Sequence, residues 1–189
     1  MRVIGGSRRG AILKSRNTYE TRPTSGKVRE SLFNILRGGN YGKCVEGANF
    51  IDLFAGTGAV GLEALSQGAK FASFIEIDKE IAKTIQKNVF KLKFQTESSI
   101  INSDAMILDY WREEPADIIF ADPPYNSGNG VLAIANLKRI GALSKRSVVV
   151  LETDKNEIID LSVMDSASLK LAEQRTYGRA LLRFFKSSL

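Results

Sequence analysis

The chain has 189 residues, of which 43% are apolar and 25% are charged, the composition of a soluble globular protein long enough to bury one core. A single cysteine and no histidine exclude an internal disulfide, a thiolate zinc cluster, a histidine base and a histidine-ligated metal. No apolar run approaches the roughly 18 residues of a membrane span, and the first residues lack the apolar segment of a secretory signal. We therefore expect a cytoplasmic protein.

Positive charge is concentrated at the amino end. Residues 1–46 contain 10 Lys/Arg and 3 Asp/Glu, whereas residues 47–189 contain 17 and 18, so the whole net charge of +6 comes from the first quarter of the chain. Such asymmetry indicates a polyanionic partner, most simply a nucleic acid. A solvated basic tail without a partner is the alternative.

The basic segment is predicted to form a hairpin followed by a helix. Residues 2–16 alternate strand-like runs with glycines, and a hairpin there carries Arg8, Arg9, Lys14 and Arg16. Ser25 or Thr24 can cap a helix that ends at Gly38-Gly39. Its apolar stripe is Val28, Leu32, Ile35 and Leu36, which places Lys27, Arg29 and Arg37 away from the core.

Residues 47–189 alternate buried strands with helices. Strands are expected at 49–54, 70–77, 99–102, 116–122 and 147–152, and helices at 59–67, 79–92 and 130–139. This alternation predicts a parallel sheet covered on both faces. Two strand-like runs around Tyr177-Gly178 predict an antiparallel hairpin at the end. The expected fold is α/β and Rossmann-like, with a seven-stranded, mostly parallel sheet in residues 47–189 and a small extension in residues 1–46.

The first strand of this sheet runs into a glycine-rich loop. In DLFAGTGAVG (52–61), Gly56, Gly58 and Gly61 match G-x-G-x-x-G, and Glu76 ends the next strand. Ligands of such sheets bind beyond the carboxyl ends of the strands. Glycines let the backbone approach a ligand, and the acid can accept two ribose hydroxyls. The loop therefore predicts an adenosine cofactor, with an ordinary tight turn as the alternative.

Asp52 separates the classes of adenosine cofactor. A dinucleotide places its pyrophosphate at the helix amino-terminus, where a carboxylate would repel it. An acid suits a cation instead, such as the amino group of S-adenosylmethionine. Asp104, in NSDAM (102–106), follows a strand and could accept from the adenine amino group, or could be an ordinary turn aspartate. We predict S-adenosylmethionine rather than a nicotinamide dinucleotide.

FADPPY (120–125) ends another buried strand on a carboxylate. Pro123 and Pro124 have no amide hydrogen and cannot continue a central ladder, so the strand must end at Asp122. Asp122 and the Pro123 carbonyl can accept N–H bonds from an exocyclic base amine, whose conjugated lone pair must be drawn towards tetrahedral geometry. Tyr125 can stack on a base that has been flipped out. A Pro-Pro turn that merely closes a strand is the alternative.

Together these motifs resemble a known family. DLFAGTGAVGLEALS, IEID, NSDA and ADPPY are similar to signatures of class I S-adenosylmethionine-dependent N-methyltransferases. RVIGGSRRGAIL, RPTSGKVRESLFNIL and the final YGRALLRFF resemble the RsmD family, bacterial methyltransferases of guanine N2 in 16S ribosomal RNA. The resemblance extends nearly from end to end. The D/N-PPY/F motif alone is shared with DNA adenine-N6 and protein-glutamine methyltransferases.

The resemblance implies methyl transfer from S-adenosylmethionine to guanine N2 of 16S ribosomal RNA. We expect a monomer without a metal that acts on a small-subunit assembly particle, with naked RNA or the assembled subunit as alternatives. The resemblance also implies a catalytic loop of Asp122, Pro123, Pro124 and Tyr125. The implied cofactor residues are Asp52, Phe54, Gly56, Gly58, Glu76, Ile77, Asp104 and Ala105. The expected RNA-binding residues are Arg8, Arg9, Lys14, Arg16, Arg22 and Arg29, although Arg22-Pro23-Thr24 could instead close over the cofactor. An adenine-N6 methyltransferase, a nicotinamide-dependent oxidoreductase and a non-catalytic RNA-binding module remain as alternatives.

Overall fold

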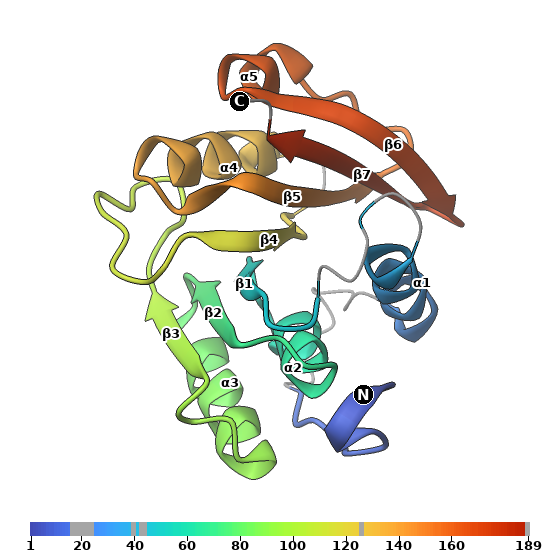
Figure 1. Ribbon diagram of the computed structural model, residues 1–189, viewed down its shortest axis with the longest axis vertical. Helices are drawn as coiled ribbons and strands as arrows, with labels where there is room; N and C mark the ends of the chain where they lie inside the picture. The colour runs from blue at the N-terminus through green and yellow to red at the C-terminus, as the bar shows by residue number, and fades with distance from the viewer. Residues whose placement is uncertain (16–24, 39–40, 42–44, 125–126, 188–189) are drawn as a thin grey trace.

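The computed structural model describes residues 1–15, 25–38, 41, 45–124 and 127–187 (Figure 1). Its centre is a seven-stranded sheet with the order β3-β2-β1-β4-β5-β7-β6. The strands are β1 (Asn49–Leu53), β2 (Phe71–Glu76), β3 (Ser98–Asn102), β4 (Ala116–Ala121), β5 (Leu143–Asp154), β6 (Leu169–Tyr177) and β7 (Ala180–Ser187). Strands β1 to β5 pair in parallel, and β7 pairs antiparallel with both β5 and β6. The predicted fold class is confirmed.

Helices cover both faces of this sheet. They are α1 (Gly26–Arg37), α2 (Ala59–Ser66), α3 (Lys79–Leu92), α4 (Asn129–Arg139) and α5 (Leu161–Ser166), with a short 3₁₀ helix η1 (Gly6–Arg8) near the amino end. Ser25 caps α1 by accepting from the Val28 amide, and Asp78 caps α3 by accepting from the amides of Glu80 and Ile81. In the part of the chain that the structure describes, no helix is both long enough and apolar enough to cross a membrane.

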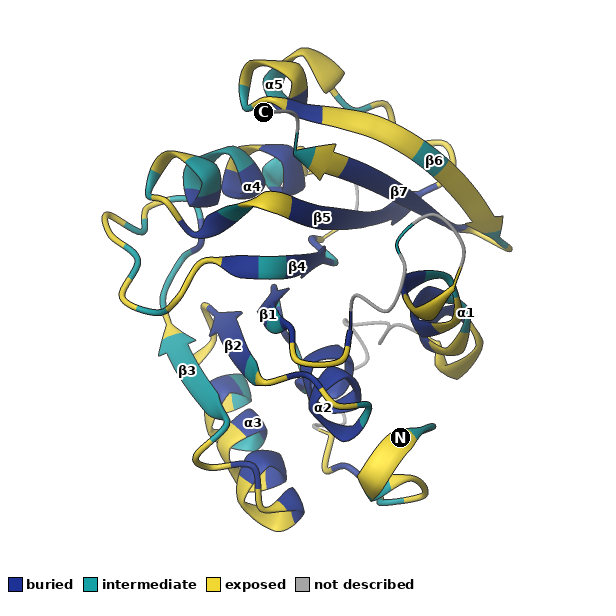
Figure 2. Cartoon of the chain, viewed as in Figure 1, coloured by how far each residue is buried: buried dark blue, intermediate teal, exposed yellow. Residues whose placement is uncertain are grey.

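The alternation of side chains along each strand divides the apolar interior into two clusters. Phe50, Phe74 and Phe120 lie in the cluster under α1, α2 and α3, which we call the front cluster. Ile51 and Ile119 lie in the cluster under α4 and α5, which we call the back cluster. Figure 1 shows α2 and α3 on one side of the sheet and α4 and α5 on the other. The central strands are buried on both faces, whereas the edge strand β6 is mostly exposed (Figure 2).

Two elements differ from the expectation drawn from the sequence. β5 begins at Leu143, earlier than predicted, because Leu143 pairs with Ala116 of β4 while the polar residues 144–146 that follow it interrupt the apolar run. The pairing of β4 with β5 also shifts register between Ala116 and Ile118. Helix α5 was not predicted, since only Met164 of its residues is buried and no apolar stripe marks it. Both errors arise where backbone pairing or a cap, rather than apolar spacing, forms the element.

The described part of the amino-terminal segment, residues 1–15, packs against the sheet-containing part of the chain, which we call the body; we call residues 1–15 the arm. Instead of the two strands of the predicted hairpin, the arm has a single antiparallel bridge between Arg2 and Ile12, and η1 lies between these two residues in the chain. Val3 and Leu13 are buried in the front cluster. The amides of Ile4 and Gly5 donate to the two carboxylate oxygens of Glu63, at 2.8 and 2.7 Å. For residues 1–15, the alternative of a freely solvated tail is therefore wrong.

Gly6 provides a test of this packing. Its φ is +72°, and a Cβ built on it would lie 1.7 Å from the carbonyl oxygen of Ser66 in α2. Gly10 has a φ of +84° but no atom within 4 Å of such a Cβ. Gly10→Ala should therefore cost only the left-handed strain, about 1–2 kcal/mol of unfolding free energy. Gly6→Ala should cost clearly more, because the arm must also move off α2. Urea unfolding of both variants measures the difference, and equal losses would contradict a docked arm.

Candidate active site

Four neighbouring strands carry an acid at their carboxyl ends. In sheet order β2, β1, β4 and β5, these acids are Glu76, Asp52, Asp122 and Glu152; we call them the carboxylate row. Two residues before each acid, the chain has a residue of the front cluster: Phe74, Phe50, Phe120 and Val150 respectively. Side chains two residues apart in a strand point to the same face, so all four acids are placed on the front face of the sheet. The strand order reverses between β1 and β4, which is where ligands bind in open α/β sheets.

The glycine loop between β1 and α2 has a tightly constrained backbone. Phe54, Gly56 and Gly58 all have positive φ, at 60°, 53° and 74°. This conformation is unusual for a side chain as bulky as phenylalanine, and strained residues of this kind cluster at ligand sites. A Cβ on Gly61 would lie 2.4 Å from the ring of Phe74, so glycine lets α2 approach β2 closely. The loop thus has the turn and the close helix–strand packing of a nucleotide-binding unit.

Glu76 fixes this loop from the neighbouring strand. Its Oε2 accepts from the Gly56 amide and its Oε1 from the Asp78 amide, both at 2.9 Å. Each carboxylate oxygen has a second lone pair, so ribose hydroxyls can still be accepted beside these bonds. Glu76 is therefore placed to hold both the loop and a ribose, and the sequence indicated only the second role.

Asp52 is buried beneath the loop. Its Oδ2 accepts from the Gly61 amide at 2.8 Å, at the start of α2. Burial, opposed by this hydrogen bond but reinforced by the negative charges of Asp122 and Glu76, raises the pKa of Asp52 to about 8. The side chain is therefore mostly neutral at pH 7. A cationic amino group beside it would favour the charged form, so this acid fits the amino group of S-adenosylmethionine.

The end of β3 and the segment after it are held by side-chain amides. Asn102 donates to the carbonyls of Glu76 and Ile77, at 2.8 and 3.0 Å. Asn136 of α4 donates to the carbonyls of Ala105 and Leu108, both at 3.0 Å. The sequence indicated neither amide, because their partners are distant backbone groups without a residue-type signal.

Asp104 was predicted either to bind the adenine amino group or to be an ordinary turn aspartate, and it does make a turn contact. Its Oδ1 accepts from the Met106 amide at 2.9 Å. A carboxylate has two oxygens, so this contact leaves capacity for an adenine amino group. Ala105 is buried and Ile77 is 66% exposed at the end of β2. The cofactor roles of these three residues stay predictions.

The Asp-Pro-Pro segment stands at the end of β4. The Asp122 amide donates to the Leu53 carbonyl at 3.4 Å, so contact with β1 continues one residue past the strand. A Cβ on Gly130 would lie 2.6 Å from Leu151 and 2.9 Å from the Pro123 ring, so the first turn of α4 packs closely behind the loop. The Ser127 hydroxyl donates to the Pro124 carbonyl at 2.7 Å. These contacts preset the segment, while Tyr125 lies outside the described residues and its stacking role stays a prediction.

Comparisons with known proteins agree with this geometry. The family model "Conserved hypothetical protein 95" matches residues 1–186. Ribosomal RNA small subunit methyltransferase D of Escherichia coli strain K12 is 36% identical over 154 residues, which are 82% of this chain and 75% of that protein. The protein of the same name from Haemophilus influenzae is 31% identical over 190 residues, 99% of this chain and 94% of its own. This chain belongs to the RsmD family.

A solved structure also supports the assignment. "Putative methyltransferase yhhF from Escherichia coli" superposes with a TM-score of 0.81 at 32% identity, covering 99% of this chain and 97% of that one. The predicted family is confirmed, and with it the S-adenosylmethionine-dependent class of the enzyme. The nicotinamide-dependent alternative is set aside.

The basic residues predicted to bind RNA differ in their surroundings. Arg9 and Lys14 are exposed. Arg8 is half-buried: its Nε donates to the Leu92 carbonyl at 2.8 Å, and its guanidinium lies over the Phe94 ring, 5.2 Å from the centroid. Arg8 therefore helps to fasten the arm to the end of α3. Arg16 and Arg22 lie outside the described residues.

The prediction that Arg29 lies away from the core is wrong. Its side chain is buried in α1 with its Nε 3.5 Å from a carboxylate oxygen of Glu63, and its Nη2 donates to the Arg2 carbonyl at 2.7 Å. In this position it cannot reach an RNA phosphate. The apolar stripe drawn from the sequence was too narrow, because Arg29 and Phe33 are buried beside Val28 and Leu32. Arg29 joins α1, α2 and the arm.

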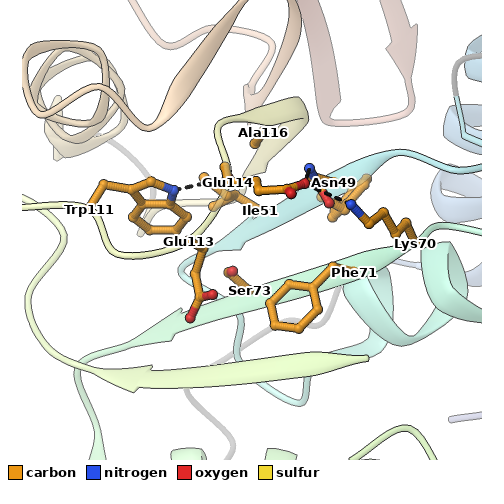
Figure 3. Close-up of a pocket in the computed structure, with 10 residues that line it drawn as sticks. Asn49, Ile51, Lys70, Phe71, Ser73, Trp111, Glu113, Glu114 and Ala116 are labelled. Atoms are coloured by element: carbon orange, nitrogen blue, oxygen red, sulfur yellow. Dashed lines mark hydrogen bonds and ion pairs between the residues drawn. The ribbon is translucent and has the colours of Figure 1, made fainter. Parts of the chain in front are cut away.

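One pocket lies at the other edge of the sheet, at the amino ends of the strands. It has a volume of about 220 Å³ and is lined by residues that include Asn49, Phe71, Trp111 and Glu114 (Figure 3). Lys70 and Asn49 both bind the Glu114 carboxylate there. Because it lies away from the carboxylate row, this pocket is separate from the candidate active site.

The raised pKa of Asp52 makes a prediction about stability. In the unfolded chain an aspartate ionises near pH 3.8, whereas in the fold Asp52 ionises near pH 8. Its contribution to stability is therefore fully present below the unfolded pKa and is lost as pH rises to about 8. Asp52→Asn keeps the acceptor for Gly61 but cannot ionise. Urea unfolding should show the variant gaining stability relative to wild type between pH 5 and pH 8.

The same variant should lose affinity for S-adenosylhomocysteine, since the neutral amide cannot attract the amino group. Calorimetry measures this affinity.

For the unfolding experiment, a stability difference between Asp52→Asn and wild type that does not change with pH would contradict the assignment of a buried, mostly neutral Asp52.

Proposed function

We propose that this chain transfers a methyl group from S-adenosylmethionine to the exocyclic N2 of a guanine in 16S ribosomal RNA, within a small-subunit assembly particle. One observation carries the proposal: in a chain of the RsmD family, Asp122 ends β4 directly beside the strand that carries the glycine loop and Asp52. A base acceptor and a cofactor loop on adjacent strand ends would bring the methyl donor and the amine side by side.

The cofactor would be held by the loop and the first two acids of the carboxylate row. Glu76 would accept from the ribose hydroxyls, Asp52 would face the amino group, and Asp104 would accept from the adenine amine. Gly56 and Gly58 have no side chain to exclude it. When bound, S-adenosylmethionine supplies an electrophilic methyl group; everything else in the reaction depends on how the chain positions the base.

Asp122 and the Pro123 carbonyl would act on the base. By accepting the two N–H bonds of the exocyclic amine, they turn its lone pair out of conjugation with the ring and towards the methyl donor. After transfer the nitrogen carries one proton too many, and Asp122 is placed to take it. Pro123 is buried against α4, so little reorganisation is needed at the moment of reaction.

RNA would be held by the basic face of the arm, where Arg2, Arg9 and Lys14 are exposed in the described residues 1–15; Arg9 and Lys14 are the two that the sequence predicted to bind RNA. The arm is fastened to the body near the glycine loop, because Asn88 of α3 bonds the amide and carbonyl of Lys14 and the carbonyl of Thr57. We expect a monomer to be active.

Asp122→Ala tests the catalytic loop. Methyl transfer to small-subunit RNA should be lost, because the amine has no carboxylate acceptor, while affinity for S-adenosylhomocysteine should stay within a few-fold. Tritium transfer from labelled S-adenosylmethionine and calorimetry measure the two effects. Asp109→Ala, at an exposed position, is the matched control and should leave both unchanged. Near-normal turnover by Asp122→Ala would show that another group accepts from the amine.

The double substitution Arg9→Ala and Lys14→Ala tests the RNA surface. Each lost phosphate contact should reduce the slope of log affinity against log salt by about 0.7–0.9, whereas the melting temperature should barely change, because both side chains are exposed. Lys145→Ala with Arg146→Ala removes the same charge from exposed positions at the amino end of β5. RNA binding between low and moderate salt should separate the two pairs; coincident slopes would mean that the arm does not hold RNA.

A further inference from the structure

The fourth member of the carboxylate row has no part in the mechanism above. Glu152 lies in β5, the strand next to β4, and the last paired residues of the two strands are Ala121 and Leu151. Asp122 and Glu152 are the next residues of each strand, so they stand opposite one another. Neighbouring strands are about 4.8 Å apart, which places the two backbones from which these acids project at that spacing.

Both side chains are placed on the same face of the sheet. Phe120 and Val150 belong to the front cluster, and Ala121 and Leu151 to the back cluster, so the following residue of each strand returns to the front. The β7 residue opposite Glu152 is Leu182, which also belongs to the front cluster. Glu152 is only 3% exposed. Burying a carboxylate costs free energy. Because Glu152 lies at the edge of the sheet where the candidate active site is formed, a role in binding a ligand would explain why it is kept there.

The Watson–Crick edge of guanine matches two adjacent acceptors. It presents the N2 amine and, next to it, the N1–H group, which are both donors. Adenine presents an amine at C6 but a bare acceptor at N1. An enzyme that acts on an extruded base reads this edge by hydrogen bonds. A buried carboxylate facing position 1 would therefore bind guanine and repel adenine.

We propose that Glu152 selects the base: it accepts from N1–H of guanine while Asp122 accepts from the N2 amine. This inference rests on the proposed function and adds to it a residue for base specificity. Sites that hydrogen-bond one group of a substrate strongly reject an analogue without that group, because the buried partner is left unpaired. Glu152 is thus a residue that favours guanine over adenine-like bases, and its loss should alter the choice of base rather than only the rate.

The base 2-aminopurine tests this directly. It keeps the N2 amine that is methylated but has an acceptor at N1 in place of the N–H donor. The substrate is whichever form of small-subunit RNA the wild-type enzyme methylates, the RNA alone or the RNA assembled into particles. It is prepared with either guanine or 2-aminopurine at the target position. Wild type should prefer guanine by about 100-fold or more in kcat/KM. Glu152→Gln, whose amide can donate to N1 of 2-aminopurine, should reduce this preference at least tenfold.

Glu157→Gln is the matched control. Glu157 is also buried, but it lies beside Arg183, which donates to its backbone carbonyl. Its substitution should leave the preference for guanine over 2-aminopurine unchanged, even if turnover falls. Glu152→Gln with equal losses on both bases would overturn the inference and assign Glu152 a structural role. Wild type that methylates both bases equally would also overturn it. Wild type that methylates no RNA would contradict the proposed function itself.

Discussion

Carboxylates that bind backbone amides at the ends of two strands hold this site together. Asp52 accepts from Gly61 and Glu76 accepts from Gly56, so both ends of the glycine loop are tied to the sheet by side chains rather than by the sheet ladder alone. The loop needs such ties because Phe54, Gly56 and Gly58 adopt left-handed conformations. Without them, the strain at Phe54 would be relieved by relaxing the loop, and the cofactor surface would be lost.

This arrangement separates two kinds of charge. In the proposed function, the carboxylate row would bind groups that carry positive charge or donate hydrogen bonds: the amino group and ribose hydroxyls of the cofactor, and the N–H groups of a guanine. The cations of the arm lie at the surface and suit phosphates. Burial of the Asp52 carboxyl, reinforced by the nearby acids Asp122 and Glu76, raises its pKa, and keeping such a group there costs stability. Residues that destabilise the empty protein are expected where function needs them.

Much of this could be predicted from the sequence. Apolar runs located every strand of the parallel sheet. The helix predicted at 79–92 matches α3 at both ends, and Ser25 was one of the two predicted caps of α1. Asp52 and Asp122 were recognisable because glycines or prolines follow them, and Glu76 because it ends the strand after the glycine loop. Glu152 was not singled out, because no such residue marks its strand end. These signals are local, and local patterns survive folding.

The failures were of another kind. Arg29 resembled a surface cation because its partner Glu63 is distant in sequence. The packing of Arg8 over Phe94 was also missed, because nothing local in the sequence shows that this ring lies under it; the contact of Arg8 with RNA stays a prediction. Asn88 and Asn136 hold segments of backbone whose positions only the fold creates. When a side chain binds backbone or another side chain that is distant in sequence, no periodic pattern of residue types marks the contact, so the sequence alone does not show it.

The most direct test is the identity of the methylated nucleoside. Small-subunit particles from a strain that lacks this protein are incubated with the purified enzyme and labelled S-adenosylmethionine, and the RNA is digested and separated by mass spectrometry. The account predicts N2-methylguanosine at one position, absent when Asp122 is alanine. Label in N6-methyladenosine, or in no nucleoside of the RNA, would contradict it.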